Sequence, residues 1–207
     1  MKTDQVDQVI DCEDVIKSMK FIVGNINEVI KLLDREDIKS MLQKILEGDR
    51  IFVMGAGRSG LVAKAFAMRL MHLGFTVYVV GETTTPAVGQ KDVVIAISGS
   101  GETRSIADLG KIVKDIGSTL ITVTSKKEST LGRTSDITMV LPSKTKNDHD
   151  AGGSLEKNMR GDYKNLPPLG TAFEIISLVF LDSVIAQLIK LKGVSEAELK
   201  LRHTNIE

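Results

Sequence analysis

Cysteine is almost missing from the 207 residues, since Cys12 is the single one. One thiol excludes an internal disulfide framework and a cysteine-rich zinc site. An excess of one charge is missing too, because 27 Lys and Arg balance 27 Asp and Glu, for a formal net charge of zero. A protein that grips nucleic acid or an anionic membrane usually carries excess positive charge. We therefore expect neither nucleic acid nor a membrane as a partner.

The sequence also lacks a stretch with the composition of a secretory signal or a membrane span. The first five residues are too polar for a signal. The most apolar stretch, residues 172–191, still contains Glu174, Asp182 and Gln187, and so indicates a buried helix. A chain of 207 residues suffices for one hydrophobic core. We expect a single cytoplasmic domain spanning residues 1–207.

The hydrophobic pattern predicts an α/β fold preceded by helices. Apolar residues recur at three- and four-residue steps over 4–47, with a break at 34–37, which predicts two helices ending at Gly48. We interpret residues 1–48 as a helical bracket that clasps the core, a neighbouring subunit, or both. Five apolar runs then alternate with helical segments, which predicts a three-layer α/β/α sandwich around a five-stranded parallel sheet. These runs are 51–54, 76–80, 92–97, 119–124 and 137–141.

A polar segment over residues 143–166 interrupts this alternation. It contains Gly152-Gly153 and no sustained periodicity. A connection of this length inside a compact domain is usually a lid or a disordered insertion. The polar composition favours the disordered insertion.

The first glycine-rich turn, Gly55-x-Gly57-x-x-Gly60, follows a predicted strand and opens a predicted helix. It matches the dinucleotide fingerprint, and Glu82 lies near the position of the ribose-binding acid. A nicotinamide-dependent oxidoreductase is therefore one candidate function, although no hydride-acceptor site is obvious. The same glycines also suit a phosphosugar site, or a tight strand-to-helix turn that binds nothing.

The second turn, residues 98–103, reads Ser-Gly-Ser-Gly-Glu-Thr. Hydroxyls and exposed amides at a helix start suit a phosphate monoester, and a dinucleotide protein needs no second phosphate cradle. Alternatively, Ser100 or Thr103 only caps the following helix. Threonines in residues 81–86, Thr84 among them, offer hydroxyls to a sugar or form a turn. Because parallel strands end at one edge, we expect all three loops to face one crevice.

With these motifs the chain resembles the sugar isomerase (SIS) domain family and, within it, the 6-phospho-3-hexuloisomerases. The resemblance runs from about residue 4 to the C-terminus, and residues 145–165 are longer than the corresponding connection in the family. The segments that carry it are 55–60, 66–75, 81–86, 97–103, 168–174, 180–182 and 202–207.

This resemblance implies the SIS fold, which is flavodoxin-like, and a reaction without cofactor or metal. The implied reaction interconverts D-arabino-hex-3-ulose 6-phosphate and D-fructose 6-phosphate through an enediol, as in formaldehyde fixation by the ribulose monophosphate pathway. It also implies a homo-oligomer, either a dimer or a homotetramer. Two alternatives stay open, a non-catalytic SIS module that binds a sugar phosphate and an SIS isomerase of another phosphosugar.

Moving a carbonyl from C3 to C2 requires a base that removes a proton next to the carbonyl. Glu174 stands at the start of an apolar helix, where partial burial would raise its pKa, although it could instead form a capping box with Thr171. The resemblance implies that Glu174 is the base. His203 reads as a solvated tail residue, but the resemblance implies that it reaches an adjacent subunit and helps to open the sugar ring.

The other expected site residues surround the substrate. We expect Ser59 to hydrogen-bond the substrate and Thr84 to contact the sugar. Arg58 neutralises phosphate charge or pairs with an acid at a subunit interface. Asp182 is expected to have a structural partner and His72 to be a packed helix residue. The phosphate is expected on the second turn, that is on Ser98, Gly99, Ser100, Gly101, Glu102 and Thr103.

Overall fold

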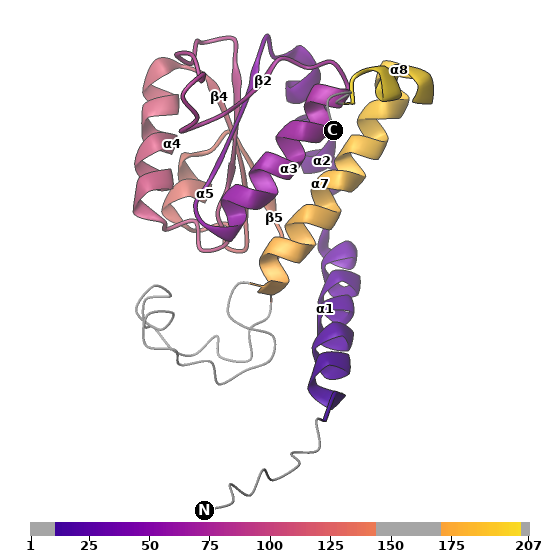
Figure 1. Cartoon of the computed structure of the whole chain (residues 1–207). Coiled ribbons are helices and arrows are strands. Elements are labelled where there is room, and N and C mark those ends of the chain that lie inside the picture. The colour runs from indigo at the N-terminus through magenta and orange to yellow at the C-terminus, as the bar shows by residue number, and fades with distance from the viewer. Residues whose placement is uncertain (1–10, 144–170, 204–207) are drawn as a thin grey trace, which may run out of the picture.

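The computed structural model describes residues 11–143 and 171–203. Its centre is a parallel sheet with strand order β2-β1-β3-β4-β5 (Figure 1). The strands are β1 Ile51–Gly55, β2 Val77–Val79, β3 Val93–Ile97, β4 Thr119–Thr124 and β5 Ile137–Val140. The predicted five-stranded parallel sheet is therefore confirmed. The polar loop predicted over 143–166 lies, beyond Ser143, outside the described residues.

Helices cover both faces of the sheet, because its strands are apolar on both sides. Ile51 and Val53 of β1 belong to one hydrophobic cluster, together with residues of α2, α3 and α7. Phe52 and Met54 belong to the opposite cluster, with α4 and α5. The predicted three-layer sandwich is thus confirmed. These helices are α2 Arg35–Glu47, α3 Arg58–His72, α4 Arg104–Ile116, α5 Thr130–Thr134 and α7 Thr171–Lys192.

Helix α7 is long and apolar enough, by length and composition alone, to cross a membrane. Half of that apolar window is buried inside the protein, and residues such as Phe173, Ile176 and Leu181 belong to the core. Helices α3 and α7 pack side by side. The prediction of a buried core helix is confirmed. A short helix, α8 Glu196–Leu201, follows and begins with a capping box between Ser195 and Glu198.

The first two helices differ in how they meet the body. Asp34 ends the break between them, because its side chain accepts from the Glu36 amide at 2.8 Å and starts α2. Helix α2 then buries Met41 and Ile45 completely. Helix α1, Glu13–Leu32, buries only Asn25 and Val29 and extends away from the body (Figure 1).

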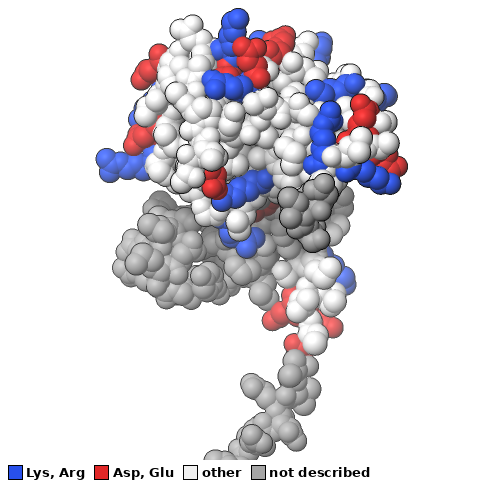
Figure 2. Space-filling view, turned by 45° about the horizontal axis from the view of Figure 1, so that its top comes forward, with Lys and Arg blue, Asp and Glu red and all other residues white. Residues whose placement is uncertain are grey.

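At the edge where the strands begin, an ion pair joins β1 to β3. The Asp92 carboxylate accepts from Arg50 Nε at 3.0 Å, from Arg50 Nη2 at 2.6 Å and from the Gly89 amide at 2.6 Å. Elsewhere, Lys/Arg and Asp/Glu are interspersed over the surface visible in Figure 2, without a broad patch of one sign. The ion pair between Arg50 and Asp92 thus stabilises the edge at which the strands begin, and the three predicted site loops follow the strands at the opposite edge.

Candidate functional site

The site lies where the strand order reverses. From β1 the chain crosses to β2 at one side and then to β3 at the other, so α3 and α4 leave the sheet on opposite faces. Such switch points gather ligands in open parallel sheets. The loops 55–60, 81–86 and 98–103 all follow strands at this edge, which is the lower one in Figure 1, where α7 begins. The three loops thus lie at one edge of the sheet, and a crevice shared by all three stays a prediction.

The glycines of the first turn serve close packing of strand against helix. A Cβ on Gly55 would lie 2.8 Å from the Ser59 backbone, and one on Gly60 would lie 2.8 Å from the Gly55 oxygen. Glu82, the possible ribose acid, pairs with Lys64 of α3 at 2.6 Å. Both features that favoured a dinucleotide thus have an explanation without one.

The second turn uses its carbonyls internally but leaves part of its amides without an acceptor in the described chain, while the amides of Ser98, Gly101 and Glu102 donate within the protein. The carbonyl oxygens of Ser98, Gly99 and Gly101 accept internal backbone hydrogen bonds at 3.1, 3.0 and 3.0 Å. Within the described part of the chain, no acceptor takes the amides of Ser100 and Thr103. Free amides beside a helix start form a concave anion site. This arrangement suits a phosphate.

The hydroxyls of this turn do not cap α4. Thr103 is its N-cap residue but makes no capping bond with its side chain. Ser100 Oγ accepts from the Glu102 amide at 3.1 Å, inside the turn itself. The buried Ser98 donates to Thr103 Oγ1 at 3.4 Å. The capping alternative therefore has no support, and the hydroxyls stay grouped around the amides.

Glu102 fastens the turn to α5. Its carboxylate accepts from Thr130 Oγ1 and from the Thr130 amide, both at 2.7 Å, and these bonds hold the pKa of Glu102 below its usual value. Gly101 lies against the start of α5 as well, since a Cβ on it would meet Ser129. Its φ of +64° is a second reason for glycine at this position. In this structure Glu102 shapes the loop through Thr130 instead of turning its carboxylate toward a ligand. The sequence analysis missed Ser129 and Thr130, although a Ser-Thr pair after a strand signals a helix start.

The first turn of α7 joins the two glycine-rich turns. The Phe173 ring lies 3.0 Å from where a Cβ of Gly99 would be, and Glu174 Oε2 accepts from Arg58 Nε at 3.4 Å. The Glu174 side chain is 14% exposed, and burial raises its pKa while Arg58 opposes the rise. No hydrogen bond to Thr171 is found among its contacts in the described residues. Glu174 is therefore a half-buried carboxylate with a raised pKa beside the anion site.

Two further predicted contacts lie near this centre. Ser59 is 8% exposed in the first turn of α3, next to Arg58. Thr84 is exposed in the loop after β2, where its neighbour Thr85 donates to the Val79 oxygen at 2.6 Å. Within the described residues, no group of three or more His, Cys, Asp or Glu could hold a metal ion.

His203 lies at the far end of α3 from Glu174 in the same chain. Its ring stacks on His72 at 3.9 Å between centroids, and Arg202 Nη1 donates to the His72 oxygen at 3.2 Å. Helix α3 begins at Arg58 and has 15 residues, or about 22 Å at 1.5 Å per residue. One chain therefore does not bring His203 to Glu174, and a role for His203 in the reaction requires a second copy.

Two lesser expectations are settled by packing. His72 is 5% exposed, so it is the packed helix residue that was predicted. Asp182 pairs with Arg69 at 3.8 Å, as expected of a structural residue. Asp182 is not buried in its apolar helix, however, because the side chains of both partners are 48% exposed. The pair therefore lies at the surface, where ion pairs contribute little.

Comparison with known proteins agrees with this arrangement. The family model described as SIS domain matches residues 44–154, more than half of the chain. The chain belongs to the SIS domain family. Within this family it belongs with the 3-hexulose-6-phosphate isomerases, since it is 35% identical to the Bacillus subtilis enzyme of that name. That match covers 93% of this chain and 100% of the relative.

Two other SIS relatives extend the comparison. An uncharacterized protein of Archaeoglobus fulgidus is 43% identical, over 93% of this chain and 100% of the relative. A crystal structure from Methanococcus jannaschii, reported to infer a molecular function of 3-hexulose-6-phosphate isomerase, has a TM-score of 0.76 and 34% identity. It covers 92% of this chain and 99% of the other. The likeness to this family of isomerases therefore spans nearly the whole chain.

Proposed function

We propose that this chain is a cytoplasmic isomerase that interconverts D-arabino-hex-3-ulose 6-phosphate and D-fructose 6-phosphate. The observation that carries the proposal is the position of Glu174. This half-buried carboxylate with a raised pKa stands beside the amide-lined turn 98–103, to which Phe173 ties it. The names of the relatives support the choice of substrate.

The proposed reaction uses one carboxylate twice. The phosphate binds the amides and hydroxyls of residues 98–103, with Ser59 as a further donor to the substrate. Glu174 takes the proton from C2 of the 3-ulose, which gives a 2,3-enediolate with its charge on O3. A proton then passes from the C2 hydroxyl to O3, and the protonated Glu174 returns its proton to C3, which leaves the carbonyl at C2. Because burial raises the pKa of Glu174, the carboxylate is a stronger base than an exposed one.

Fructose 6-phosphate closes into a furanose ring, which must open before the reverse reaction and forms again after the forward one, whereas the 3-ulose is open because its O6 carries the phosphate. We propose that His203 of a neighbouring chain assists the opening in a homodimer or homotetramer, because His203 lies far from Glu174 within one chain. A neutral imidazole can pass a proton between the ring oxygen and the anomeric hydroxyl. We further propose that the product enters the ribulose monophosphate pathway of formaldehyde fixation.

The test is a coupled assay for fructose 6-phosphate, fed by hexulose 6-phosphate made in situ, with wild type beside Glu174→Gln. We expect product from wild type and a loss of about 100-fold or more in the variant, because the base is gone. Well-folded wild type that forms no product would overturn the proposed function. Other phosphosugars offered to the same preparation then test the alternative substrate.

Two controls separate chemistry from binding and folding. Equal affinity of Glu174→Gln and wild type for fructose 6-phosphate would show that the carboxylate adds reaction rather than binding. Since burial disfavours the ionised form of Glu174, the neutral amide is expected to keep the unfolding midpoint at pH 7 or to raise it. Full activity of the variant would leave the enzyme standing and remove Glu174 as its base.

A further inference from the structure

Helix α1 carries an apolar stripe that the described chain leaves mostly exposed. Val15, Met19, Val23 and Ile30 are 61, 60, 55 and 61% exposed. At 100° per residue they fall within one sector of less than a quarter turn, in which Ile26 is the residue that packs partly against the core, and the buried Val29 borders the sector. An isolated amphipathic helix gains most of its stability from packing this face. The stripe therefore needs an occupant.

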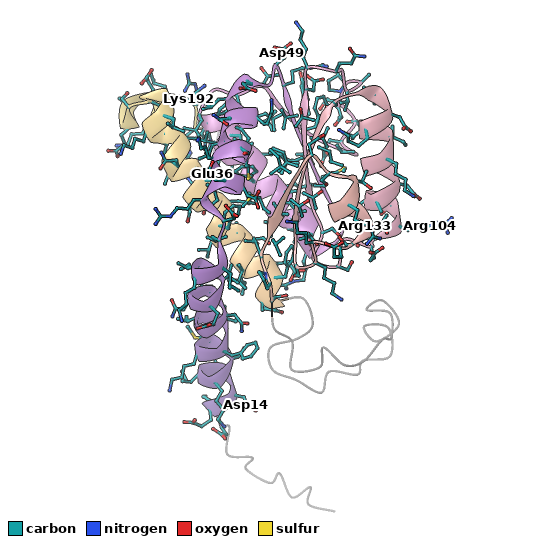
Figure 3. The ribbon with its side chains drawn as sticks, turned by 180° about the vertical axis from the view of Figure 1, so that it is seen from behind. Asp14, Glu36, Asp49, Arg104, Arg133 and Lys192 are labelled. Carbon is teal, nitrogen blue, oxygen red and sulfur yellow. The ribbon has the colours of Figure 1, made fainter. Side chains whose placement is uncertain are left out.

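The body carries a groove of complementary character between α2 and α7. Figure 3 shows the two helices side by side. The floor of the groove includes the buried Leu42, Phe180 and Val184, and its rim includes Leu46 and Leu191, which are 41 and 51% exposed. It has a volume of about 590 Å³. A groove between two helices receives the apolar face of a third helix.

We propose that this groove binds α1 of a second copy of the same chain. Its own α1 ends at Leu32 beside the start of α2 and points away from the groove, so that Asp14 and Lys192 mark opposite ends of the molecule (Figure 3). A two-fold axis perpendicular to α1 near Glu36 reverses one copy against the other. Each α1 then lies along the partner's groove, so that the same two-fold rotation buries both apolar stripes in both grooves.

The charges at the helix ends agree with this packing. The axis carries the acidic first turn of α1, Glu13 and Asp14, toward the last turn of the partner's α7, which is basic through Lys190 and Lys192. Opposite charges at matched ends fix the direction of docking. Helix α1 has 20 residues, or about 30 Å, and α7 lines the groove from Phe180 to Leu191, or about 18 Å, so the groove receives a little over half of the helix.

A membrane surface fits the stripe less well. Helices that lie on membranes are rich in Lys and Arg on their polar face. In α1 the three lysines are balanced by three acids, Glu13, Asp14 and Glu28. A second copy of the chain is therefore the occupant that both the stripe and the groove favour.

The first test measures the mass of the full chain by sedimentation equilibrium, without substrate. We expect wild type to be an even-numbered assembly, and Met19→Glu and Leu191→Glu each to halve its mass. Both side chains are exposed within one copy, so the substitutions spare the fold of the protomer. Ile112→Glu on α4, 51% exposed on the other layer, is the matched control and should keep the wild-type mass. Monomeric wild type, or two variants of unchanged mass, would overturn the proposal.

The second test asks which helix meets which groove. In a Cys12→Ser background, Val23→Cys in one tagged chain and Gln187→Cys in a differently tagged chain are mixed and treated with a short bis-maleimide. We expect a product that carries both tags. Cross-linking only within a Val23→Cys/Gln187→Cys double variant would show that α1 folds back on its own groove, and would overturn the proposal, as would no product.

This proposal deepens the homo-oligomer of the proposed function, and the two can fail separately. Mass and cross-linking are read without turnover, so an inactive chain that assembles by this groove would leave the interface standing. An active chain that stays monomeric would leave the isomerase standing and remove both the interface and the cross-subunit role of His203.

Discussion

Replacing Gly101 by alanine should damage both stability and phosphate binding, and the structure allows the damage to be divided. Gly101 has φ +64°, and an L-residue in that conformation costs roughly 1–2 kcal/mol. Its Cβ would overlap Ser129 Oγ and lie 2.5 Å from Ser129 Cβ, which no rotamer relieves. Such overpacking adds about 1–3 kcal/mol. We therefore expect Gly101→Ala to lose about 2–5 kcal/mol of unfolding free energy.

Gly193 supplies the matched control. It also has φ +64°, but a Cβ there would meet nothing within 4 Å, so Gly193→Ala should lose only the roughly 1–2 kcal/mol of backbone conformation. Urea unfolding measures both losses. Michaelis constants for the phosphosugar should rise about ten-fold in Gly101→Ala, or about 1.4 kcal/mol, and stay unchanged in Gly193→Ala.

Ser129 decides between the two causes. Adding Ser129→Gly to Gly101→Ala removes the overlap and should recover stability, less the few tenths of a kcal/mol that glycine costs in place of serine at the N-cap of α5. Equal destabilisation in Gly101→Ala and Gly193→Ala would refute the steric argument. So would a double variant less stable than Gly101→Ala.

Three other substitutions test the remaining contacts. Burial acts to raise the pKa of Asp92, but Arg50 outweighs it, so the pKa lies below its usual value. The stabilisation by the ion pair is therefore present above about pH 4 and fades on acidification. Asp92→Asn should lose about 3 kcal/mol of unfolding free energy at pH 7, and the difference from wild type in urea unfolding should shrink toward pH 3. Arg58→Met removes the cation that opposes the burial-raised pKa of Glu174, so the acid limb of the kcat/KM profile should move to higher pH; movement to lower pH would contradict this. Glu102→Gln loosens the loop and should raise KM with kcat within about two-fold, whereas a fall in kcat alone would point to a direct role in the reaction.

The sequence predicted the sheet well because its strands leave a strong local signal. Each apolar run is short and is flanked by glycine or polar residues, and the three central strands, β1, β3 and β4, are almost wholly buried, so composition and burial agree there. The edge strands β2 and β5 are mostly half-buried. The grouping of the two glycine-rich turns also followed, because strand direction alone brings them to one edge. Glu174 was found by its motif and its place at the start of an apolar helix.

Relations between distant side chains were out of reach. That Glu102 turns to Thr130, 28 positions away, depends on how α5 packs after β4. That Asp182 is half exposed depends on which face of an almost uniformly apolar helix meets α3, and such a helix has no periodicity to show it. The stacking of His203 on His72 likewise depends on the turn after α8.

The carboxylate and the anion-binding turns come from separate stretches of chain, with Arg58 and Glu174 116 positions apart. The part that matches the SIS domain, residues 44–154, contains both turns and stops before α7. Ligand recognition and conversion can therefore change independently during evolution. Under the proposed function, a descendant that lost only the carboxylate would still bind a sugar phosphate, so one substitution would separate a metabolic enzyme from a sensor.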